Sequence, residues 1–489
     1  MKRIALLMIA LIVAGVALAQ RIEQESSSAT LRRIDRQAEQ MKRKILSSKT
    51  EVKPAGTIYY VSAEGDDAND GLSPTKPLRT LERVNALGLR PSDGVMFRRG
   101  DMWRGYVNTR EGVTYSAYGC GEKPRIYGSP CDAAVVGKWI ATDTPNVYMY
   151  DMELPDDVGT LVFNHGEAGC AYKVMMEKKS GVPSLHLATR EVFESYRDLR
   201  RDLDMYHDYR GTKRLYLCSV EGNPSERFAS IELLPRSNIF RVVNDVTIDN
   251  ICLKYCGAHA IGAGTTKGLT VTNCELGWIG GSIQFEHAEG VPTRYGNAIE
   301  IYGGCEDFTI DNCYVYQVYD AALTHQHQGD TKHMLTMKNV RYTNCLVEDC
   351  VYAIEYFLGR ADTLKEHYML NVLFENNILR RAGMGWGSQR PNVETPAIIK
   401  SWSHHNNRAF NYVIRDNIFD RSTYDLLNIA YRDAYSAPKM EGNTYVQYLG
   451  SDGGHLGQDR KAYGYDGSFP AVMERIFGES KGKYIFIEK

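Results

Sequence analysis

The segment Thr309-Ile310-Asp311-Asn312-Cys313 decides the fold, because five other stretches in the second half of the chain repeat its pattern. They are Thr247-Ile248-Asp249-Asn250, Thr270-Val271-Thr272-Asn273-Cys274, Arg341-Tyr342-Thr343-Asn344-Cys345, Leu373-Phe374-Glu375-Asn376 and Val413-Ile414-Arg415-Asp416. Their fourth residues follow one another at distances of 23, 39, 32, 32 and 40 residues. A basic period near 23, lengthened by insertions in some repeats, indicates a coiled and repetitive architecture.

Each repeat contains two strands joined by a bend. Apolar and polar residues alternate before the Asn, as they do in a strand. After Asn273 the apolar phase slips by one residue, from Leu269 and Val271 to Cys274 and Leu276. A slip at a residue type that tolerates left-handed backbone marks a sharp bend between strands.

These features predict an all-β fold, a right-handed parallel β-helix. Its coils stack about 4.8 Å apart and align their side chains in columns. We expect the bend Asn residues to form an amide ladder, and Cys274, Cys313 and Cys345 to share the next inward column as buried thiols. A β-propeller is the structural rival, but it needs four strands per blade and hairpin turns, and these repeats contain no Asn-Gly turn.

Composition narrows the class of protein. The 489 residues include 58 basic and 60 acidic side chains, a net charge of −2, which argues against a nucleic-acid partner. Beyond the N-terminus no apolar stretch is long enough to insert into a membrane. The 32 Tyr residues, against 14 Phe, favour a hydrated surface on which rings can stack. We expect a water-soluble monomer.

The N-terminus is typical of an exported protein. Lys2 and Arg3 precede an apolar run over residues 4–19 that ends in Ala17-Leu18-Ala19, which predicts a signal peptide cleaved after Ala19. Gln20 follows the cleavage point, so a lipoprotein anchor is not expected. We predict a periplasmic or extracellular location. The 11 Cys are odd in number and form no C-x-x-C pair, which favours buried thiols over a disulfide framework or a zinc site.

Three further regions accompany the repeats. Residues 20–55 are charged, with apolar residues at helical spacing, and predict a linker or a short amphipathic helix. Residues 56–489 are expected to form a single domain, capped by a helix near 78–87. Residues 131–235 interrupt the pattern and predict a mixed α/β insertion, with a helix near 189–203 and a strand at 214–218.

Several motifs resemble a known group of proteins. YYVSAEGDDANDGLSPTKPLRTL (59–81), FRRGDMWRG (97–105) and YGCGEKPRIYGS (118–129) resemble the first coils of secreted, pectate-lyase-like parallel β-helix proteins. CGAHAIG (256–262), GWIGGSIQ (277–284), RYGNAIEIYGG (294–304) and VYQVYDAALTHQ (315–326) resemble the central coils of a bacterial subgroup. The resemblance spans about residues 57–430. It implies a relation to β-helix carbohydrate-active enzymes, including a glycoside hydrolase family with fucosidase and xylanase members, but it assigns no catalytic residue.

The candidate site follows from aligning the coils. An inward apolar column contains Ile299, Leu323, Ile354, Ile399 and Leu427. The next residue of each coil points outward, which gives Ile261, Glu300, Thr324, Glu355, Lys400 and Asn428. Two positions further along, also outward, are Ala263, Tyr302, Gln326, Phe357, Trp402 and Ala430. Asp320 is outward by the same parity and nearer the bend. Loops at 285–295, 326–334, 358–370 and 383–396 are expected to turn this face into a groove.

This face suggests sugar chemistry. Glu300, Asp320 and Glu355 are the candidate catalytic carboxyl groups, since glycosidic cleavage needs two carboxyl groups in different protonation states. Candidate substrate-binding residues are Tyr302, Thr324, Gln326, Phe357, Lys400 and Trp402, because sugar rings stack on aromatic side chains. Lys400, one coil from Glu355, is expected to keep Glu355 ionised as base or nucleophile, which leaves Glu300 as the acid. The competing interpretation is a solvated surface on which Lys400 only pairs with Glu355.

Three functions stay open at this stage. A glycoside hydrolase would use the carboxyl groups, and a polysaccharide lyase would use Lys400 as base with Arg360 or Arg390 neutralising a uronate. A glycan-binding β-helix without catalysis would need only the aromatic column. The sequence implies no cofactor and leaves a Ca²⁺ ion held by loop carboxylates open. His325, His327 and His333 could together suggest a metal, although His325 has inward parity, whereas the adjacent His404 and His405 face opposite ways and form a poor chelating pair, so no metal site is assigned.

Overall fold

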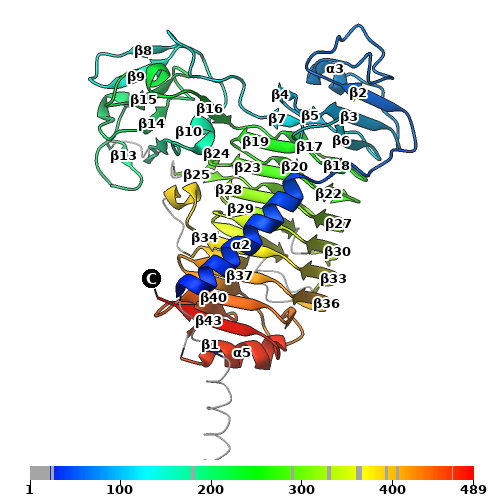
Figure 1. Cartoon of the computed structure of the whole chain (residues 1–489). Coiled ribbons are helices and arrows are strands. Elements are labelled where there is room, and N and C mark those ends of the chain that lie inside the picture. The colour runs from blue at the N-terminus through cyan, green and yellow to red at the C-terminus, as the bar shows by residue number, and fades with distance from the viewer. Residues whose placement is uncertain are drawn as a thin grey trace, which may run out of the picture.

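The computed structural model describes residues 22–23, 27–177, 182–287, 291–327, 332–359, 366–390, 395–402, 407–464 and 466–488. The segment predicted to be a signal peptide lies outside these residues, as do Arg360, His404 and His405. The described chain forms a parallel β-helix in which three long sheets run along the coil (Figure 1). The predicted fold class is therefore confirmed.

Sheets A, B and C are named here for the three faces of the coil. Sheet A contains β4 (Met102–Arg104), β7 (Arg125–Tyr127), β19 (Cys252–Cys256), β23 (Glu275–Ile279), β28 (Tyr314–Val318), β31 (Leu346–Glu348), β34 (Ile378–Ala382), β37 (Ile418–Ser422), β40 (Thr444–Tyr448), β43 (Lys483–Ile487) and β1 (Ile22–Glu23). Sheet B contains β2 (Ile58–Val61), β3 (Gly94–Arg98), β6 (Thr114–Tyr118), β18 (Thr247–Asp249), β22 (Thr270–Thr272), β27 (Cys305–Asp311), β30 (Thr336–Thr343), β33 (His367–Glu375), β36 (Asn407–Arg415) and β39 (Lys439–Glu441), with β21 (Thr266–Lys267) beside β27. Sheet C contains β5 (Val107–Asn108), β17 (Phe240–Arg241), β20 (Ile261–Ala263), β26 (Ile299–Tyr302), β29 (Ala321–His327), β32 (Tyr352–Leu358), β35 (Ala397–Ser401), β38 (Asp425–Ile429), β41 (Asp452–Leu456) and β42 (Lys461–Gly464).

The repeated Asn residues lie at the bend between sheets B and A, as predicted. Asn250, Asn273, Asn312, Asn344, Asn376 and Asp416 all adopt left-handed backbone, with φ between 51° and 59°. Asn and Asp tolerate this conformation better than other residues that carry a side chain. The repeat therefore records a backbone requirement at one corner of every coil.

The expected ladder of bend residues is present between Asn312 and Asn273, where Asn312 Nδ2 donates to Asn273 Oδ1 at 2.6 Å. A second, buried amide ladder lies one residue further along. The Asn376 position is followed by Asn377, whose Nδ2 donates to Asn417 Oδ1 at 2.9 Å. Asn417 continues the ladder to Asn443 at 3.0 Å, and Asn443 Nδ2 donates to Glu479 at 2.9 Å. In earlier coils the same inward column contains Cys274, Cys313 and Cys345, all fully buried as free thiols. Where Cys occupies this column, its buried side chains are apolar. Where Asn occupies it, the buried amides hydrogen-bond to one another.

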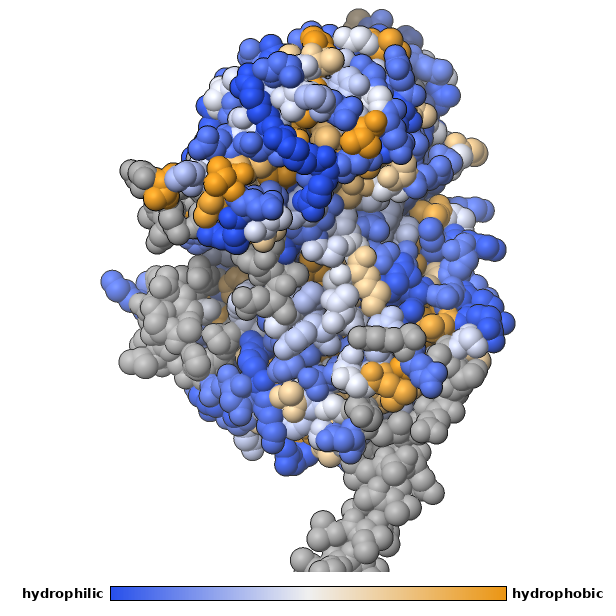
Figure 2. Space-filling view, turned by 90° about the vertical axis from the view of Figure 1, so that its left-hand side faces the viewer, coloured by the Kyte–Doolittle hydropathy of each residue, from blue (hydrophilic) through white to orange (hydrophobic). Residues whose placement is uncertain are grey.

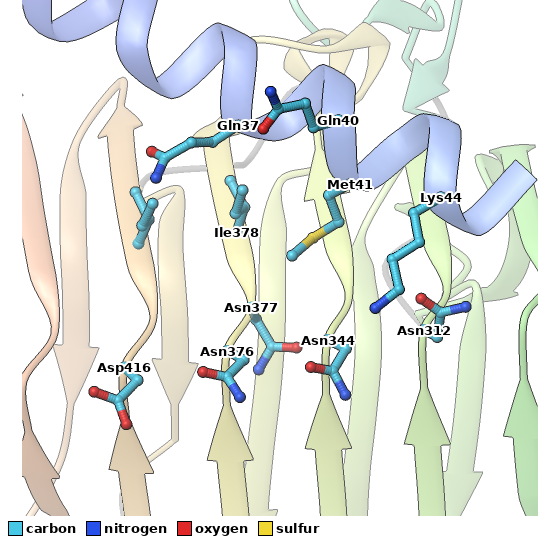
Figure 3. A pocket seen from close by; sticks show the side chains of 11 residues that line it. Gln37, Gln40, Met41, Lys44, Asn312, Asn344, Asn376, Asn377, Ile378 and Asp416 are labelled. Carbon is cyan, nitrogen blue, oxygen red and sulfur yellow. The ribbon is translucent and has the colours of Figure 1, made fainter.

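Residues 20–55 contain a long helix rather than a linker. Helix α2 (Ser27–Leu46) crosses the outer surface of sheet A, where Ala38 and Ile45 pack against Tyr314, Leu346 and Ile378 (Figure 1). Figure 3 shows Gln37, Gln40, Met41 and Lys44 of this helix above the bend residues Asn312, Asn344, Asn376 and Asp416. The helix therefore covers an outward apolar stripe of the coil.

Short helices close the two ends of the coil. Helix α3 (Leu81–Asn85) begins at Thr80, whose hydroxyl accepts from the Arg83 amide, and it places Leu81 and Val84 in the core near the first coils. Helix α5 (Ser468–Phe477) buries Phe469, Val472 and Met473 in the same core at the other end. Capping of this kind is what a solenoid needs at its terminal repeats.

The insertion between sheets is mostly β-structure. Its strands are β8 (Trp139–Ala141), β9 (Val147–Tyr150), β10 (Val158–Phe163), β11 (Tyr172–Lys173), β12 (Met176–Glu177), β13 (Leu185–His186), β14 (Asp204–His207), β15 (Leu215–Cys218) and β16 (Ile231–Pro235). Its helical turns are η1 (Asn164–Gly166), η2 (Tyr196–Asp198) and α4 (Pro224–Arg227). The helix expected near 189–203 is wrong: only the single turn η2 forms there, with Ser195 capping it. The strand expected at 214–218 is present as β15.

The remaining elements contact the insertion and sheet A, β24 (Ser282–Glu286) against β10 and η3 (Trp386–Gln389) against β28. Strands β24 and β25 (Pro292–Tyr295) form an antiparallel hairpin, and η3 follows β34. Figure 2 shows a side of the molecule on which hydrophilic residues predominate and hydrophobic groups are small and separate. No helix among the described residues is long and apolar enough to cross a membrane.

Candidate active site

Sheet C aligns the candidate residues in one column. Glu300 pairs with Thr324, Thr324 with Glu355, Glu355 with Lys400, and Lys400 with Asn428. Neighbouring coils are about 4.8 Å apart, so Glu300 and Glu355 lie about 9.6 Å apart along the column. The order expected from the sequence alignment is present from Glu300 onward.

The first coil of the alignment was wrong by one residue. Ile261 pairs with Ile299 and belongs to the inward column, so Gly262 is the neighbour of Glu300. Thr266 pairs with Cys305, which shows that the turn at Gly303 and Gly304 contains one residue more than the matching turn of the preceding coil. Gly262 has no side chain, and the space above it is filled by Asn238, whose Nδ2 would lie 2.6 Å from a Cβ at this position.

Two groups hold Glu300 in its ionised form. His259 Nδ1 is 2.9 Å from Glu300 Oε2, and Asn297 Nδ2 donates to the same oxygen at 2.5 Å. Burial acts to raise the pKa of Glu300, but the His259 charge and these hydrogen bonds outweigh burial, and the pKa of Glu300 lies below its ordinary value. The same contact raises the pKa of His259 against the opposing effect of its own burial. No described residue bonds to Glu300 Oε1, which is left for a water or a ligand.

Asp320 is paired with an arginine delivered by η3. The Trp386 indole donates to the Gln317 carbonyl at 2.8 Å and its ring packs on Tyr319, which fixes η3 against this coil. Arg390, just after η3, donates from Nη1 to Asp320 Oδ1 at 2.5 Å. Burial raises the pKa of Asp320, Arg390 lowers it, and nearby Glu300 raises it, with a raised pKa as the net result.

Glu355 has the opposite electrostatic environment to Glu300. Gln326 Nε2 donates to its Oε2 at 2.6 Å, and the Trp402 indole N–H donates to its Oε1. Burial, followed by the negative charge of Asp320, raises the pKa of Glu355 to about 8 despite these donors. Glu355 is therefore protonated near neutral pH while Glu300 is ionised.

This arrangement reverses the acid and base assignment expected from the sequence. Lys400 was expected to keep Glu355 charged, but its Nζ turns instead to Thr395 Oγ1 at 3.0 Å and Asn428 Oδ1 at 3.1 Å. Glu300, expected to have no cation nearby, is held by His259 from the preceding coil. The surface interpretation is wrong as well, since Glu300, Asp320 and Glu355 are each at most 9% exposed.

Aromatic rings flank the carboxyl groups. Tyr302 and Trp402 are 43% and 49% exposed, unusually high for such large rings. Phe357 is half-buried and packs edge-on against Tyr302, with ring centroids 6.4 Å apart. Thr324 is fully buried and its hydroxyl donates to the Ile299 carbonyl, so it belongs to the floor and does not line open surface. Tyr302 and Trp402 therefore present exposed ring surface beside the carboxyl groups.

A groove continues from Glu300 toward the first coils. Its volume is about 400 Å³. The residues lining it are Asn108, Thr109, Asn238, Arg241, Val242, Val243, His259, Gly262, Ala263, Gly264 and Glu300. Polar side chains thus line a depression that begins at a candidate catalytic carboxylate.

The sequence did not single out His259, Asn297 or Arg460, the last of which donates to Asn428. It also did not predict the contact of Arg390 with Asp320. His259 and Asn297 lie within the motifs at 256–262 and 294–304, but those motifs predicted only how the coils align. Arg390 acts from 70 residues away in sequence, which no period could reveal.

The histidines that the structure describes are not grouped as metal ligands. His325 is inward and fully buried, its Nδ1 lies 3.0 Å from the Tyr342 hydroxyl, and burial lowers its pKa to about 3. Across the described ranges, no group of three or more His, Cys, Asp or Glu side chains is arranged to hold a metal ion.

Comparisons with known proteins give distant similarities only. No protein-family model matches the sequence, and no curated protein matches it. Among solved structures, the complex of XylC with xylose matches at 11% identity and a TM-score of 0.42, covering 81% of this chain and 76% of the other. The GH136 lacto-N-biosidase from Eubacterium ramulus matches at 12% identity and 0.36, covering 88% and 68%. A rhamnogalacturonan lyase matches at 10% identity and 0.37, covering 81% and 75%. At this level of similarity, none of these structures assigns a reaction or a catalytic residue to this chain.

Proposed function

We propose that this protein is a carbohydrate-active enzyme, a glycoside hydrolase whose acid is Glu355 and whose base is Glu300. The observation that supports it is the opposite pKa shift of two carboxyl groups in one column of a partly covered face. Glycosidic cleavage needs this division, because one group must give a proton while the other accepts one.

The proposed reaction proceeds between these two groups. Glu355 gives its proton to the glycosidic oxygen as the bond from that oxygen to the anomeric carbon breaks. A water held at Glu300 Oε1 attacks the anomeric carbon, and Glu300 takes a proton from it. The products are a sugar with a new reducing end and the released alcohol. Proton exchange with solvent returns both groups to their starting states.

Neighbouring side chains support these roles. The charge of Asp320 keeps the proton on Glu355, and Arg390 holds Asp320 in place. Gln326 and Trp402 orient the Glu355 carboxyl group, while His259 and Asn297 orient Glu300. The exposed rings of Tyr302 and Trp402 would stack with the sugar units on either side of the cleaved bond.

The test is a pair of amide variants assayed on a polysaccharide panel. Glu300→Gln and Glu355→Gln should each lower the release of reducing ends by several orders of magnitude while the fold persists. An aryl glycoside with a good leaving group should restore the Glu355→Gln variant more than the Glu300→Gln variant, because its departure needs less protonation. Wild-type rates in both variants would reject the pair.

Lyase chemistry is the second candidate, and Lys400 is the observation that favours it. Burial, followed by the charge of Arg460, lowers the pKa of Lys400 to about 8, within range of a general base. Against it, Arg390 is engaged by Asp320, so it is not free to neutralise a uronate. Unsaturated products that absorb in the ultraviolet would identify a lyase, whereas saturated products with new reducing ends identify a hydrolase.

Export and a monomeric state remain predictions. Cells expressing the full chain should secrete a protein whose first residue is Gln20. A mature N-terminus that still contains residues 1–19 would contradict the predicted cleavage.

A further inference from the structure

Beyond Glu355, Lys400 of the sheet C column and Arg460 of the turn between β41 and β42 converge on one amide, that of Asn428. Lys400 Nζ donates to Asn428 Oδ1 at 3.1 Å, and Arg460 Nη1 donates to the same oxygen at 2.6 Å. Arg460 Nη2 donates to the Ser401 carbonyl at 2.6 Å, and Lys400 also reaches Thr395 Oγ1. All of these acceptors are neutral.

Neither cation has a carboxylate partner in the described part of the chain. Two acids stand close by. Glu355 pairs with Lys400 in the sheet register, but its carboxyl group accepts from Gln326 and Trp402. Asp425 Oδ1 lies 2.8 Å from His455 Nδ1, and Asp425 Oδ2 accepts from Asn428 Nδ2 at 2.8 Å. Asp425 therefore faces His455 and the amide rather than Lys400 or Arg460. Lys400 is buried and Arg460 is half-buried. Neighbouring cations withdrawn from water in this way normally have an acid between them, because the desolvation cost of each is otherwise uncompensated.

The position of Arg460 is itself imposed by the fold. It follows Gly457 in the turn between β41 and β42, and its backbone is left-handed, with φ of 50°. A long side chain rarely adopts this conformation. The turn directs the guanidinium toward Lys400, where it shares the Asn428 acceptor. A solvent-exposed arginine would not require this backbone conformation.

An exposed ring completes the arrangement. Lys400 Nζ lies 5.1 Å from the centre of the Trp402 ring, and that ring is 49% exposed. The indole N–H of the same residue donates to Glu355. A sugar stacked on Trp402 would thus have the cations beside it and the acid at its edge.

We propose that the Lys400–Arg460 pair and Trp402 form a subsite for an anionic sugar, whose carboxylate or sulfate ester lies between the two cations. The placing of this sugar next to the cleaved bond rests on the proposed function, but the binding does not. Lys400 uses two of its three N–H bonds on described residues, and Arg460 Nε has no described acceptor, so donors remain for the anion.

Binding by a catalytically blocked protein tests the proposal. The full mature chain with Glu300→Gln is titrated in a calorimeter with oligogalacturonates and with their methyl esters, which differ in charge alone. The second pair is sulfated galactan oligosaccharides and the same oligosaccharides after desulfation. We expect one charged member to bind at least about tenfold more tightly than its neutral partner. Preference within the first pair identifies a carboxylate, and preference within the second identifies a sulfate ester.

Variants then assign the preference to this pair of residues. Lys400→Gln and Arg460→Gln, each added to Glu300→Gln, should weaken binding of the charged member about tenfold and leave the neutral member unchanged. Arg415→Gln is the control, because Arg415 lies on sheet B and pairs with Glu375. Arg460 sits in a turn, so its variant tests the proposal even where Lys400→Gln does not fold.

The outcomes separate this proposal from the proposed function. Equal binding of charged and neutral partners, no binding of any charged member, or unchanged binding in both variants would overturn the subsite. Charge-dependent binding together with wild-type hydrolysis in Glu300→Gln would uphold the subsite and reject only the hydrolase assignment.

Discussion

Glu300 and Glu355 lie in one outward column of sheet C with Thr324 between them, yet their pKa values shift in opposite directions. Their positions in the column are equivalent and do not by themselves explain different pKa values. The difference comes from the surroundings of each group. His259 of the preceding coil and Asn297 of the same coil contact Glu300, whereas Glu355 is buried among neutral donors and near the charge of Asp320. One repeated backbone position thus carries an ionised carboxyl group on one coil and a protonated one two coils further on.

The first prediction is a bell-shaped pH profile for kcat. Activity should fall above a pH of about 8, as Glu355 loses the proton it must donate, and it should fall below 4.5, as Glu300 gains one. Initial rates across a pH series check both limits. An alkaline limit that is unchanged in Glu355→Asp would contradict the assignment of that limit to Glu355.

Protein stability should carry the same signature. The folded pKa of Glu355 is about 8 and its ordinary value is 4.5, so the folded state binds this proton more tightly than the unfolded state. Its contribution is fully favourable below pH 4.5 and is lost as the pH rises through about 8. Glu355→Gln cannot ionise, so its Tm relative to wild type should increase across this window.

Thermal melts of both proteins at several pH values check this expectation. Glu122→Gln is the control, because the Glu122 side chain is 82% exposed and should show no trend. A Tm difference that stays flat from pH 4.5 to 8 for Glu355→Gln would show that Glu355 is ionised in the folded protein.

Trp402 has two roles that two substitutions separate. Trp402→Phe keeps a ring but removes the N–H that lowers the pKa of Glu355, so the alkaline limit should move to higher pH with KM little changed. Trp402→Ala should move the limit similarly and also raise KM about tenfold, because the stacking surface is lost. Identical kinetics in the two variants would mean that the ring does not contact substrate.

The stacked thiols give a test of the fold itself. Cys274, Cys313 and Cys345 are fully buried, and burial raises the pKa of Cys274 and Cys313 well above the usual range. A thiol reagent should leave all three unlabelled in the native protein and label them in denaturant. Mass spectrometry of the labelled peptides identifies each residue, with exposed Cys120 as the positive control.

The sequence predicted the site column well because the Asn bends set the register. The errors arose where one residue is absorbed in a turn, as at Gly303 and Gly304, which moved Ile261 inward and brought Gly262 beside Glu300. The charge states were wrong for another reason. A column alignment identifies neighbours along the stack, such as Lys400 beside Glu355. It does not identify the acceptor of a long side chain that can reach several, and Lys400 hydrogen-bonds to Asn428. Contacts that come from outside the column, such as Arg390 to Asp320, have no period to reveal them.

The stereochemistry of hydrolysis should be inversion. Two coil spacings separate Glu300 from Glu355 by about 9.6 Å along the backbone, close to the range of about 6.5–9.5 Å found between the carboxyl groups of inverting enzymes. Retaining enzymes need about 5–5.5 Å, which corresponds to adjacent coils. Asp320 lies on the coil next to that of Glu355, because the Tyr352 amide donates to its carbonyl, and its backbone is offset along the strand from Thr324, the register neighbour of Glu355. Proton NMR of the first-formed anomer distinguishes the two outcomes.

Inversion assigns the base to Glu300, and Asp320→Asn should then keep measurable activity while its alkaline limit moves to lower pH, since the charge that raises the pKa of Glu355 is gone. Retention would instead make Asp320 the nucleophile, and Asp320→Asn would then abolish turnover.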